Sequence, residues 1–200
     1  VSRSLEEQTH RRFIKSHLAL DGLPYYETAR YIFVGRDTRD VFMSIWNHHM
    51  GYTDQTKANF KQRAASLGLE FPVEFQDLHE MWRIWINKGS FEWESSGYPY
   101  WSHLHHAQTW WDFRHLPNIL LVHYTDLLKD PEAQIRRVAA HLDIAIDEKL
   151  LPGILQRISF NAMKENFTSI MPEADQFFRG GQATCMHKGT NGQWRGVLTE

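Results

Sequence analysis

The sequence predicts an α/β fold, a three-layer sandwich in which helices cover both faces of a central parallel sheet. Two short apolar runs, at 31–34 and 118–124, have the length and the residue types of buried strands. The longer segments around them repeat their apolar residues at helical intervals. Strands that alternate with helices favour a parallel sheet, because each parallel pair needs a long crossover.

The composition is typical of a packed globular protein. The chain has 200 residues, enough for a core, and is rich in aromatic residues, with eight Trp and twelve Phe. A formal net charge of −2 gives no strong field for nucleic acid or an acidic membrane. The single cysteine, Cys185, excludes an internal disulfide and fits a reducing compartment. We expect one cytoplasmic domain over residues 1–200, with no membrane span and no nucleic-acid partner.

The N-terminal region offers a further strand. Residues 1–12 are polar and predict an exposed helix or tail, and the apolar pair Phe13 and Ile14 then predicts a short strand. On a strand, Lys15 and His17 share a face, and residues 18–30 are just long enough for a parallel crossover. From these residues alone, a solvated lysine and a hydrogen-bonded histidine account for the pair equally well.

The segment 31–51 organises the rest of the chain. Its strand is expected to be buried on both faces and ends at Gly35 and Arg36. Arg36 therefore stands at the carboxyl end of the strand, where α/β sheets bind ligands. A helix follows, with an apolar face and with Ser44 about two turns along it, within reach of the same crevice.

The start of that helix favours an anion. Asp37 and Thr38 can accept hydrogen bonds from its free amides, and Asp40 adds negative charge to its first turn. A strand, a polar turn and a helix N-terminus together form the unit that binds anions in many α/β proteins. An ordinary ion pair between Arg36 and Asp40 is the alternative explanation.

The middle of the chain is mainly helical. Residues 53–67 and 73–88 predict two helices separated by a break at 68–72. The aromatic loop 89–100 can help to shape a pocket for a small molecule. A third helix, 102–115, begins at the capping residue Ser102.

Histidines cluster in two places, which raises the question of a metal. The histidines concerned are His48, His49, His103, His105 and His106. Only His103 and His106 have a useful helical spacing, and no cysteine or carboxylate stands at a familiar ligand interval. We therefore expect no metal site.

The last third of the chain adds a strand, several helices and a basic loop. The strand is 118–124, Pro131 starts a helix behind Asp130, and a further helix covers 148–157. The loop 186–195 holds two glycines, a lysine and an arginine, which is a plausible backbone-and-cation cradle for phosphate.

These segments, in this order, resemble the sulfotransferases that use 3′-phosphoadenosine 5′-phosphosulfate (PAPS). Arg36, Asp40, Val41 and Ser44 match the family's 3′-phosphate segment, and the run Lys15-Ser-His17-Leu matches its Lys-Thr-His-Leu segment. Further matches are Tyr124-Thr-Asp-Leu, Ser159-Phe160-Asn-Ala-Met163 and the loop 186–195, which resembles Arg-Lys-Gly-x-x-Gly-Asp-Trp-Lys. The resemblance implies a P-loop nucleotide-hydrolase-like fold and transfer of a sulfuryl group from PAPS to a hydroxyl or amine.

The resemblance also implies roles for individual residues. His17 corresponds to the catalytic base, Lys15 to a group that contacts the sulfuryl oxygens, and His106 to a residue that faces the acceptor. The residues that correspond to cofactor contacts are Arg36, Ser44, Tyr124, Phe160, Met163, Met186, His187, Lys188 and Gly189. The implied partners are PAPS as donor, PAP as product and a small-molecule acceptor, with no metal required and a homodimer as a possible assembly.

The chain departs from the family pattern in three respects. His187 replaces an arginine, which predicts a weaker or pH-sensitive grip on phosphate, and Gln193 replaces an aspartate. The family's phosphosulfate loop does not precede Lys15, and its closing helix does not follow Glu200. We therefore expect a domain that is truncated at the N-terminus and incomplete at both ends. Two rivals remain: a nucleotide kinase of related fold, and a non-catalytic nucleotide- or protein-binding domain.

Overall fold

The computed structural model describes residues 6–66, 68 and 74–198. Parts of the predicted segments 1–12, 53–67, 68–72 and 73–88 therefore lie outside the described residues. The elements are η1 (Leu20–Gly22), β1 (Tyr31–Gly35), α2 (Thr38–Gly51), α3 (Asp54–Ser66), α4 (Leu78–Asn87), α5 (His103–Asp112), β2 (Ile119–His123), α6 (Tyr124–Lys129), α7 (Pro131–His141), α8 (Leu151–Arg157), α9 (Phe160–Glu165), α10 (Phe167–Ile170), α11 (Ala174–Phe177) and α12 (Gln182–Cys185).

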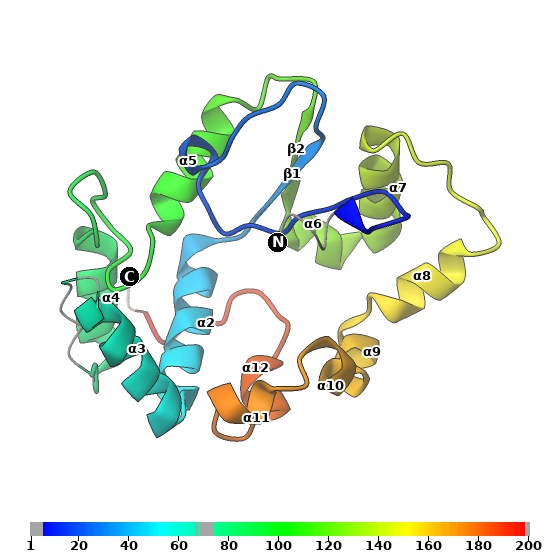
Figure 1. The fold of residues 1–200 in the computed structure, drawn as a ribbon. Helices are drawn as coiled ribbons and strands as arrows, with labels where there is room; N and C mark the ends of the chain where they lie inside the picture. Colours follow the sequence, from blue (N-terminus) through cyan, green and yellow to red (C-terminus); the bar gives the residue numbers. More distant parts are fainter. Residues whose placement is uncertain (1–5, 67, 69–73, 199–200) are drawn as a thin grey trace.

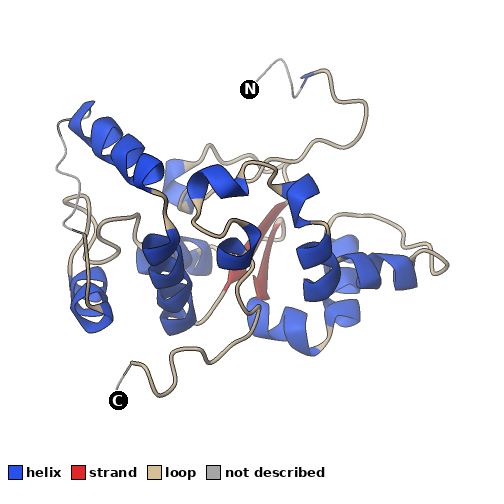
Figure 2. Cartoon of the chain, turned by 90° about the horizontal axis from the view of Figure 1, so that it is seen from below, coloured by secondary structure: helices blue, strands red, loops and turns tan. Residues whose placement is uncertain are grey.

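The two strands of the described residues pair in parallel, as the α/β prediction requires. Tyr31 lies opposite Ile119 and Gly35 lies opposite His123. Helices α2 to α5 form the crossover between the strands, and helices surround the strand pair in the view of Figure 2. Because the strands run the same way, Arg36 and Tyr124 both follow a carboxyl end at the same edge of the sheet.

The strand predicted at Phe13 and Ile14 is wrong for the described structure. The segment is extended but pairs with no strand of the described residues, and the side chains of Phe13 and Ile14 are 76% and 73% exposed. An apolar pair becomes a strand only where a neighbouring strand accepts its hydrogen bonds. Lys15 and His17 accordingly stand on an extended, exposed segment that leads into η1.

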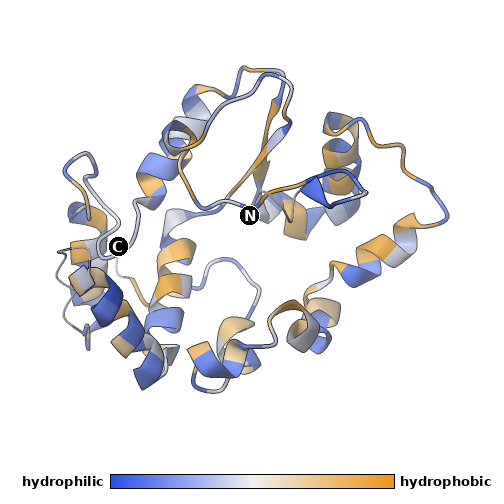
Figure 3. Ribbon diagram, viewed as in Figure 1, coloured by the Kyte–Doolittle hydropathy of each residue, from blue (hydrophilic) through white to orange (hydrophobic). Residues whose placement is uncertain are grey.

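The expectation that β1 is buried on both faces is also wrong for the described residues. Phe33 stacks on Trp110 of α5 at 5.9 Å between ring centroids, so α5 covers one face. On the other face Ile32 and Val34 are 37% and 54% exposed. A continuous apolar run does not distinguish burial on one face from burial on both. Figure 3 shows the apolar character of the strands against the largely hydrophilic helix α3.

Several helices begin at the caps that the sequence predicts. The Asp37 side chain accepts from the amide of Arg39, and that of Ser102 accepts from the amide of His105. Asp130 caps α7, with Pro131 in its first turn. Thr38 instead lies inside α2, and the helix predicted over 148–157 begins only at Leu151.

Aromatic side chains dominate the two apolar clusters. The larger cluster joins α2 and α4 and has Phe42, Phe75, Met81, Trp85 and Leu198 as its buried members. The smaller cluster, centred on Leu20, Trp110 and Ile119, packs η1 and α5 against the strands. Phe42 is 0% exposed, one turn after the start of α2, and therefore fixes that end of the helix.

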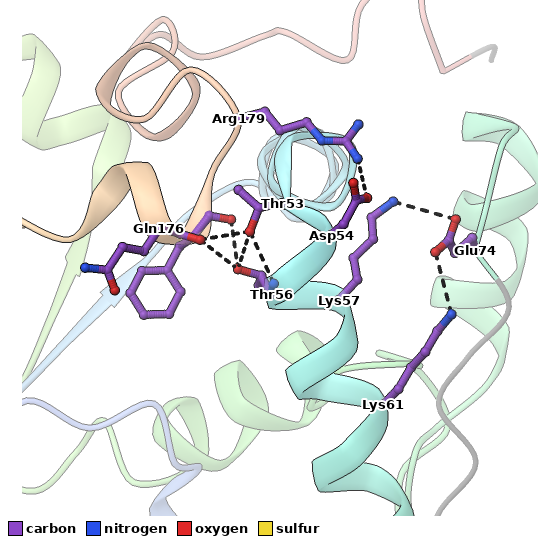
Figure 4. Close-up of polar contacts among 9 residues, drawn as sticks. Thr53, Asp54, Thr56, Lys57, Lys61, Glu74, Gln176 and Arg179 are labelled. Carbon is purple, nitrogen blue, oxygen red and sulfur yellow. Dashed lines mark hydrogen bonds and ion pairs between the residues drawn. The ribbon is translucent and has the colours of Figure 1, made fainter.

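The segment from α11 onward folds back onto α2 and α3 (Figure 1). Figure 4 shows how α3 holds it: the hydroxyls of Thr53 and Thr56 both donate to the backbone oxygen of Gln176, and Arg179 pairs with Asp54 at 2.5 Å. At the same end of α2, the amide of Arg179 donates to the oxygen of Gly51. The C-terminal region is thereby carried back toward β1.

Removal of the Phe42 side chain tests the importance of this cluster. Phe42→Ala should lower the free energy of unfolding by about 3–5 kcal/mol, the usual cost of an emptied aromatic site. The measurement is urea denaturation followed by circular dichroism. Ile170→Ala is the control, because Ile170 is 63% exposed and its loss should change stability by less than about 0.5 kcal/mol. Equal losses for the two variants would contradict the assignment of Phe42 to the core.

Candidate active site

Five of the predicted site residues converge on one small polar pocket. The pocket has a volume of about 120 Å³ and lies where β1, α2 and the loop after α12 meet. Its lining residues are Arg36, Met43, Ser44, Asn47, Cys185, His187, Lys188, Gly189 and Gln193. Arg36 and Ser44 come from the strand end and the helix, whereas His187, Lys188 and Gly189 come from a segment about 150 residues further along the chain.

Arg36 has no carboxylate partner among the described residues. Its Nη2 donates to the backbone oxygen of Thr190 at 2.8 Å, and its guanidinium lies 4.6 Å from the centre of the Tyr124 ring. Its Nε is buried and has no hydrogen-bond partner within the described part of the chain. A guanidinium with a spare buried donor and only neutral neighbours favours an anion, because its planar fork can donate to two oxygens at once.

The alternative ion pair between Arg36 and Asp40 is wrong. Asp40 is 1% exposed, and its carboxylate oxygens accept from the amides of Gly192 and Gln193 at 2.7 and 2.8 Å. Asp40 therefore neutralises nothing on Arg36. It binds the C-terminal loop to the first turn of α2 instead.

Tyr124 and Phe160 bracket the glycine of the loop. The Tyr124 hydroxyl donates to the oxygen of Gly189 at 3.1 Å. Gly189 has a φ of 64°, and a Cβ added to it would overlap the Phe160 ring. Only glycine combines that backbone conformation with so close an approach of an aromatic ring.

Two methionines predicted at the site, Met163 and Met186, are close in sequence to other predicted site residues. Met163 follows Phe160 by one turn of α9, and Met186 ends α12 immediately before His187. Both are half-buried, whereas the His187 and Lys188 side chains are exposed. His187 and Lys188, at the start of the loop, therefore face solvent at the mouth of the pocket.

Helix α5 places two partly buried histidines near the strand pair. Burial lowers the pKa of His103 below its ordinary value, and the backbone of Arg36 acts on it in the opposite direction. One turn later, burial lowers the pKa of His106, and the neighbouring His103 and His17 lower it further. His106 also contacts the Phe33 ring at 5.2 Å between centroids. His106 thus lies against the face of β1 that α5 covers.

Within residues 6–66, 68 and 74–198, no three His, Cys, Asp or Glu side chains form a group that could hold a metal ion. His105 is engaged elsewhere, in a 2.8 Å contact with Asp21. A lowered pKa keeps His103 and His106 neutral at neutral pH, which suits hydrogen bonding.

Sequence reasoning did not place Asn47, Cys185 and Met43 in the pocket. Asn47 follows Ser44 by three residues on a helix, so its spacing could have placed it on the same face. Its side-chain amide donates to the oxygen of Thr184 at 2.7 Å. Burial raises the pKa of the Cys185 thiol, so this residue contributes a neutral wall. No sequence pattern indicates that Cys185 lies in the pocket, because nothing in the sequence predicts that residue 185 returns to α2.

No helix in the described part of the chain is long and apolar enough to cross a membrane.

Comparisons with known proteins agree with this geometry. A family model described as the sulfotransferase domain matches residues 1–200. The glycolipid sulfotransferase of Mycobacterium bovis is 29% identical over 220 residues, which cover 100% of this chain and 65% of that protein. Rat sulfotransferase 1A1 is 25% identical over 202 residues, which cover 98% of this chain and 60% of that protein. The chain therefore spans about two thirds of the length of these curated relatives.

Solved structures show the same fold. Retinol dehydratase, solved in complex with androsterone and the inactive cofactor PAP, matches with a TM-score of 0.69 at 24% identity, over 97% of this chain and 51% of that chain. Mouse sulfotransferase SULT7A1, solved with PAP, matches with a TM-score of 0.67 at 19% identity, over 98% of this chain and 63% of that chain. These likenesses confirm the predicted α/β fold class. Because the family model covers the whole chain, the protein belongs to the sulfotransferase domain family.

Proposed function

We propose that the protein transfers a sulfuryl group from PAPS to the hydroxyl or amine of a small molecule. The observation that carries the proposal is the pocket in which Arg36, without a carboxylate partner among the described residues, meets Ser44 and the loop residues Lys188 and Gly189. Two cationic side chains, a hydroxyl and backbone amides are the groups that bind a phosphate. PAPS, the donor of the sulfotransferase family, carries such a phosphate on its ribose.

The neighbouring residues fit the rest of the nucleotide. Tyr124 and Phe160 stand beside Gly189, where aromatic faces can pack on a purine, and Met163 lies on the same helix as Phe160. Arg36, Ser44, Lys188 and Gly189 would hold the 3′-phosphate, with His187 at the rim. Met186 is the first residue of the loop and is half-buried.

His17 is the proposed general base. Its imidazole lies close enough to His106 to help lower the pKa of that residue. An imidazole can accept the proton of an attacking hydroxyl near neutral pH. Lys15 would stabilise charge that develops on the transferred group. His106, kept neutral by burial, would donate or accept a hydrogen bond at the acceptor.

Membership of the family does not determine the extent of the domain, the need for a metal, the cellular location, the acceptor or the assembly. We propose that residues 1–200 act as a single sulfotransferase-like domain, that no metal is required and that the protein works in the cytoplasm. Acceptors differ among the relatives, whose names include glycolipid sulfotransferases and whose solved complexes include androsterone and retinol. The acceptor of this protein is therefore defined only as a small molecule with a hydroxyl or amine, and a homodimer remains a possible assembly.

Arg36 provides the direct test of donor recognition. Arg36→Ala should weaken binding of adenosine 3′,5′-bisphosphate by about 1.5–3 kcal/mol, the range for hydrogen bonds to charged groups. Binding of adenosine 5′-monophosphate should change little, because that nucleotide lacks the phosphate that Arg36 contacts. Isothermal titration calorimetry measures both. Equal losses for the two nucleotides would refute the 3′-phosphate site.

A pair of glycine substitutions tests the contact between the loop and Phe160. Gly189→Ala and Gly196→Ala both place alanine at a positive φ, so each should destabilise the protein by about 1–2 kcal/mol. Only Gly189→Ala also brings a methyl group into the Phe160 ring, whereas Gly196 has nothing within 4 Å of an added Cβ. Nucleotide affinity should therefore fall at least tenfold in Gly189→Ala and stay within twofold of wild type in Gly196→Ala. The same affinity in both variants would show that the Phe160 contact does not shape the site.

His17 is tested through turnover. His17→Ala in the full-length protein should leave donor affinity nearly intact and lower the rate of sulfuryl transfer by roughly 10²–10⁴-fold, the usual contribution of a general base. The measurements are donor binding and single-turnover transfer on the same preparation. Near-normal transfer by the variant would remove His17 from the mechanism. Binding of PAP without any transfer by the wild-type protein would favour the non-catalytic rival.

A further inference from the structure

The first turn of α2 holds the C-terminal loop through a buried carboxylate. Asp40 is 1% exposed and belongs to the few fully buried side chains of the described residues. Both of its oxygens accept backbone amides, from Gly192 at 2.7 Å and from Gln193 at 2.8 Å. A carboxylate removed from water is stabilised only by such directed donors, so this geometry is a specific requirement for Asp40.

The surrounding contacts connect Asp40 to the phosphate-binding residues. The Gln193 side chain donates to the oxygen of Thr190, and Arg36 donates to the same oxygen. Beside Asp40, the Arg39 guanidinium lies 3.6 Å from the centre of the Trp194 ring. The charged neighbours of this turn include Arg39, which pairs with the capping residue Asp37 at 2.7 Å, and, through one shared carbonyl, Arg36. Three hydrogen bonds thus hold the backbone of Thr190, Gly192 and Gln193 to Arg36 and Asp40, and the Trp194 ring adds a fourth contact, with Arg39.

We propose that Asp40 is a positioning residue for the phosphate-binding loop. By fixing Gly192 and Gln193 to α2, it sets the place of Lys188 and Gly189 opposite Arg36 and Ser44. Because the amides take both of its oxygens, it also leaves Arg36 free to bind an external anion. The inference rests on the proposed function for the identity of that anion, a ribose 3′-phosphate. The loop anchor itself rests on hydrogen bonds alone.

The variant D40N tests the anchor with little change in volume. An asparagine side chain can accept at one oxygen but presents a donor to the second amide. In the absence of nucleotide, hydrogen exchange followed by mass spectrometry should show exchange about tenfold faster in the peptide 186–195. Peptides that contain β1 and β2 should exchange as in wild type. Unchanged exchange of the loop, or an equal rise in the strands, would overturn the proposal.

The affinities for two nucleotides distinguish a positioning role of Asp40 from a purely structural one. In D40N the affinity for adenosine 3′,5′-bisphosphate should fall about tenfold, and that for adenosine 5′-monophosphate less than threefold. The matched control is D54N, because Asp54 pairs with Arg179 of the same C-terminal region but its side chain is 89% exposed. D54N should retain both affinities and the loop exchange of wild type. An equal loss of both nucleotides in D40N would overturn the positioning role.

A variant-free measurement covers the case in which D40N does not fold. In the wild-type protein, NMR should show slower exchange for the amides of Gly192 and Gln193 than for that of the exposed Gly196. Equally fast exchange would overturn the anchor. Equal wild-type affinity for the two nucleotides would refute the proposed function instead, and the exchange data would still decide whether Asp40 anchors the loop.

Discussion

The candidate site depends on the contact between helix α2 and the chain that returns along it from α11. The contact begins where the amide of Arg179 bonds to Gly51 and continues through Asn47, which donates to Thr184. It ends at Asp40, which accepts from Gly192 and Gln193. From Gly51 to Asp40 the helix extends over roughly 16 Å, so its regular rise fixes the course of the returning segment. The basic loop reaches Arg36 because a helix of defined length guides it there.

Charge at the site follows from the same contact. Arg36 is half-buried, and Asp40 is near enough in sequence to have been a carboxylate partner for it. Backbone amides of the loop donate to the carboxylate oxygens of Asp40 instead. Arg36 is left with a carbonyl, a tyrosine ring and an unused buried donor, within the described part of the chain. The structure thus keeps a cation uncompensated at the end of a parallel strand, which is the arrangement that an anionic ligand completes.

Part of the fold could be predicted, because it depends on interactions between residues that are close in sequence. The caps at Asp37, Ser102 and Asp130 act through side chains a few residues away, so the sequence alone locates those helix starts. Burial is a tertiary property, and an apolar run could not reveal that one face of β1 stays exposed. Motif resemblance grouped Arg36 with Lys188, and the two residues line one pocket, although spacing alone does not bring residues so far apart together. Asp40 and Cys185 lay beyond prediction, because their partners depend on the return of the chain along α2.

Helix α5 contributes two histidines whose pKa values are both lowered by burial, His103 and His106. His106 also contacts the Phe33 ring of β1 at 5.2 Å between ring centroids. Three residues of helix separate the two histidines, so they project on the same face. Burial keeps both neutral, and neutral imidazoles add no competing positive charge between a bound phosphate and the proposed base. The two rings therefore leave the positive charge of the pocket to Arg36 and Lys188.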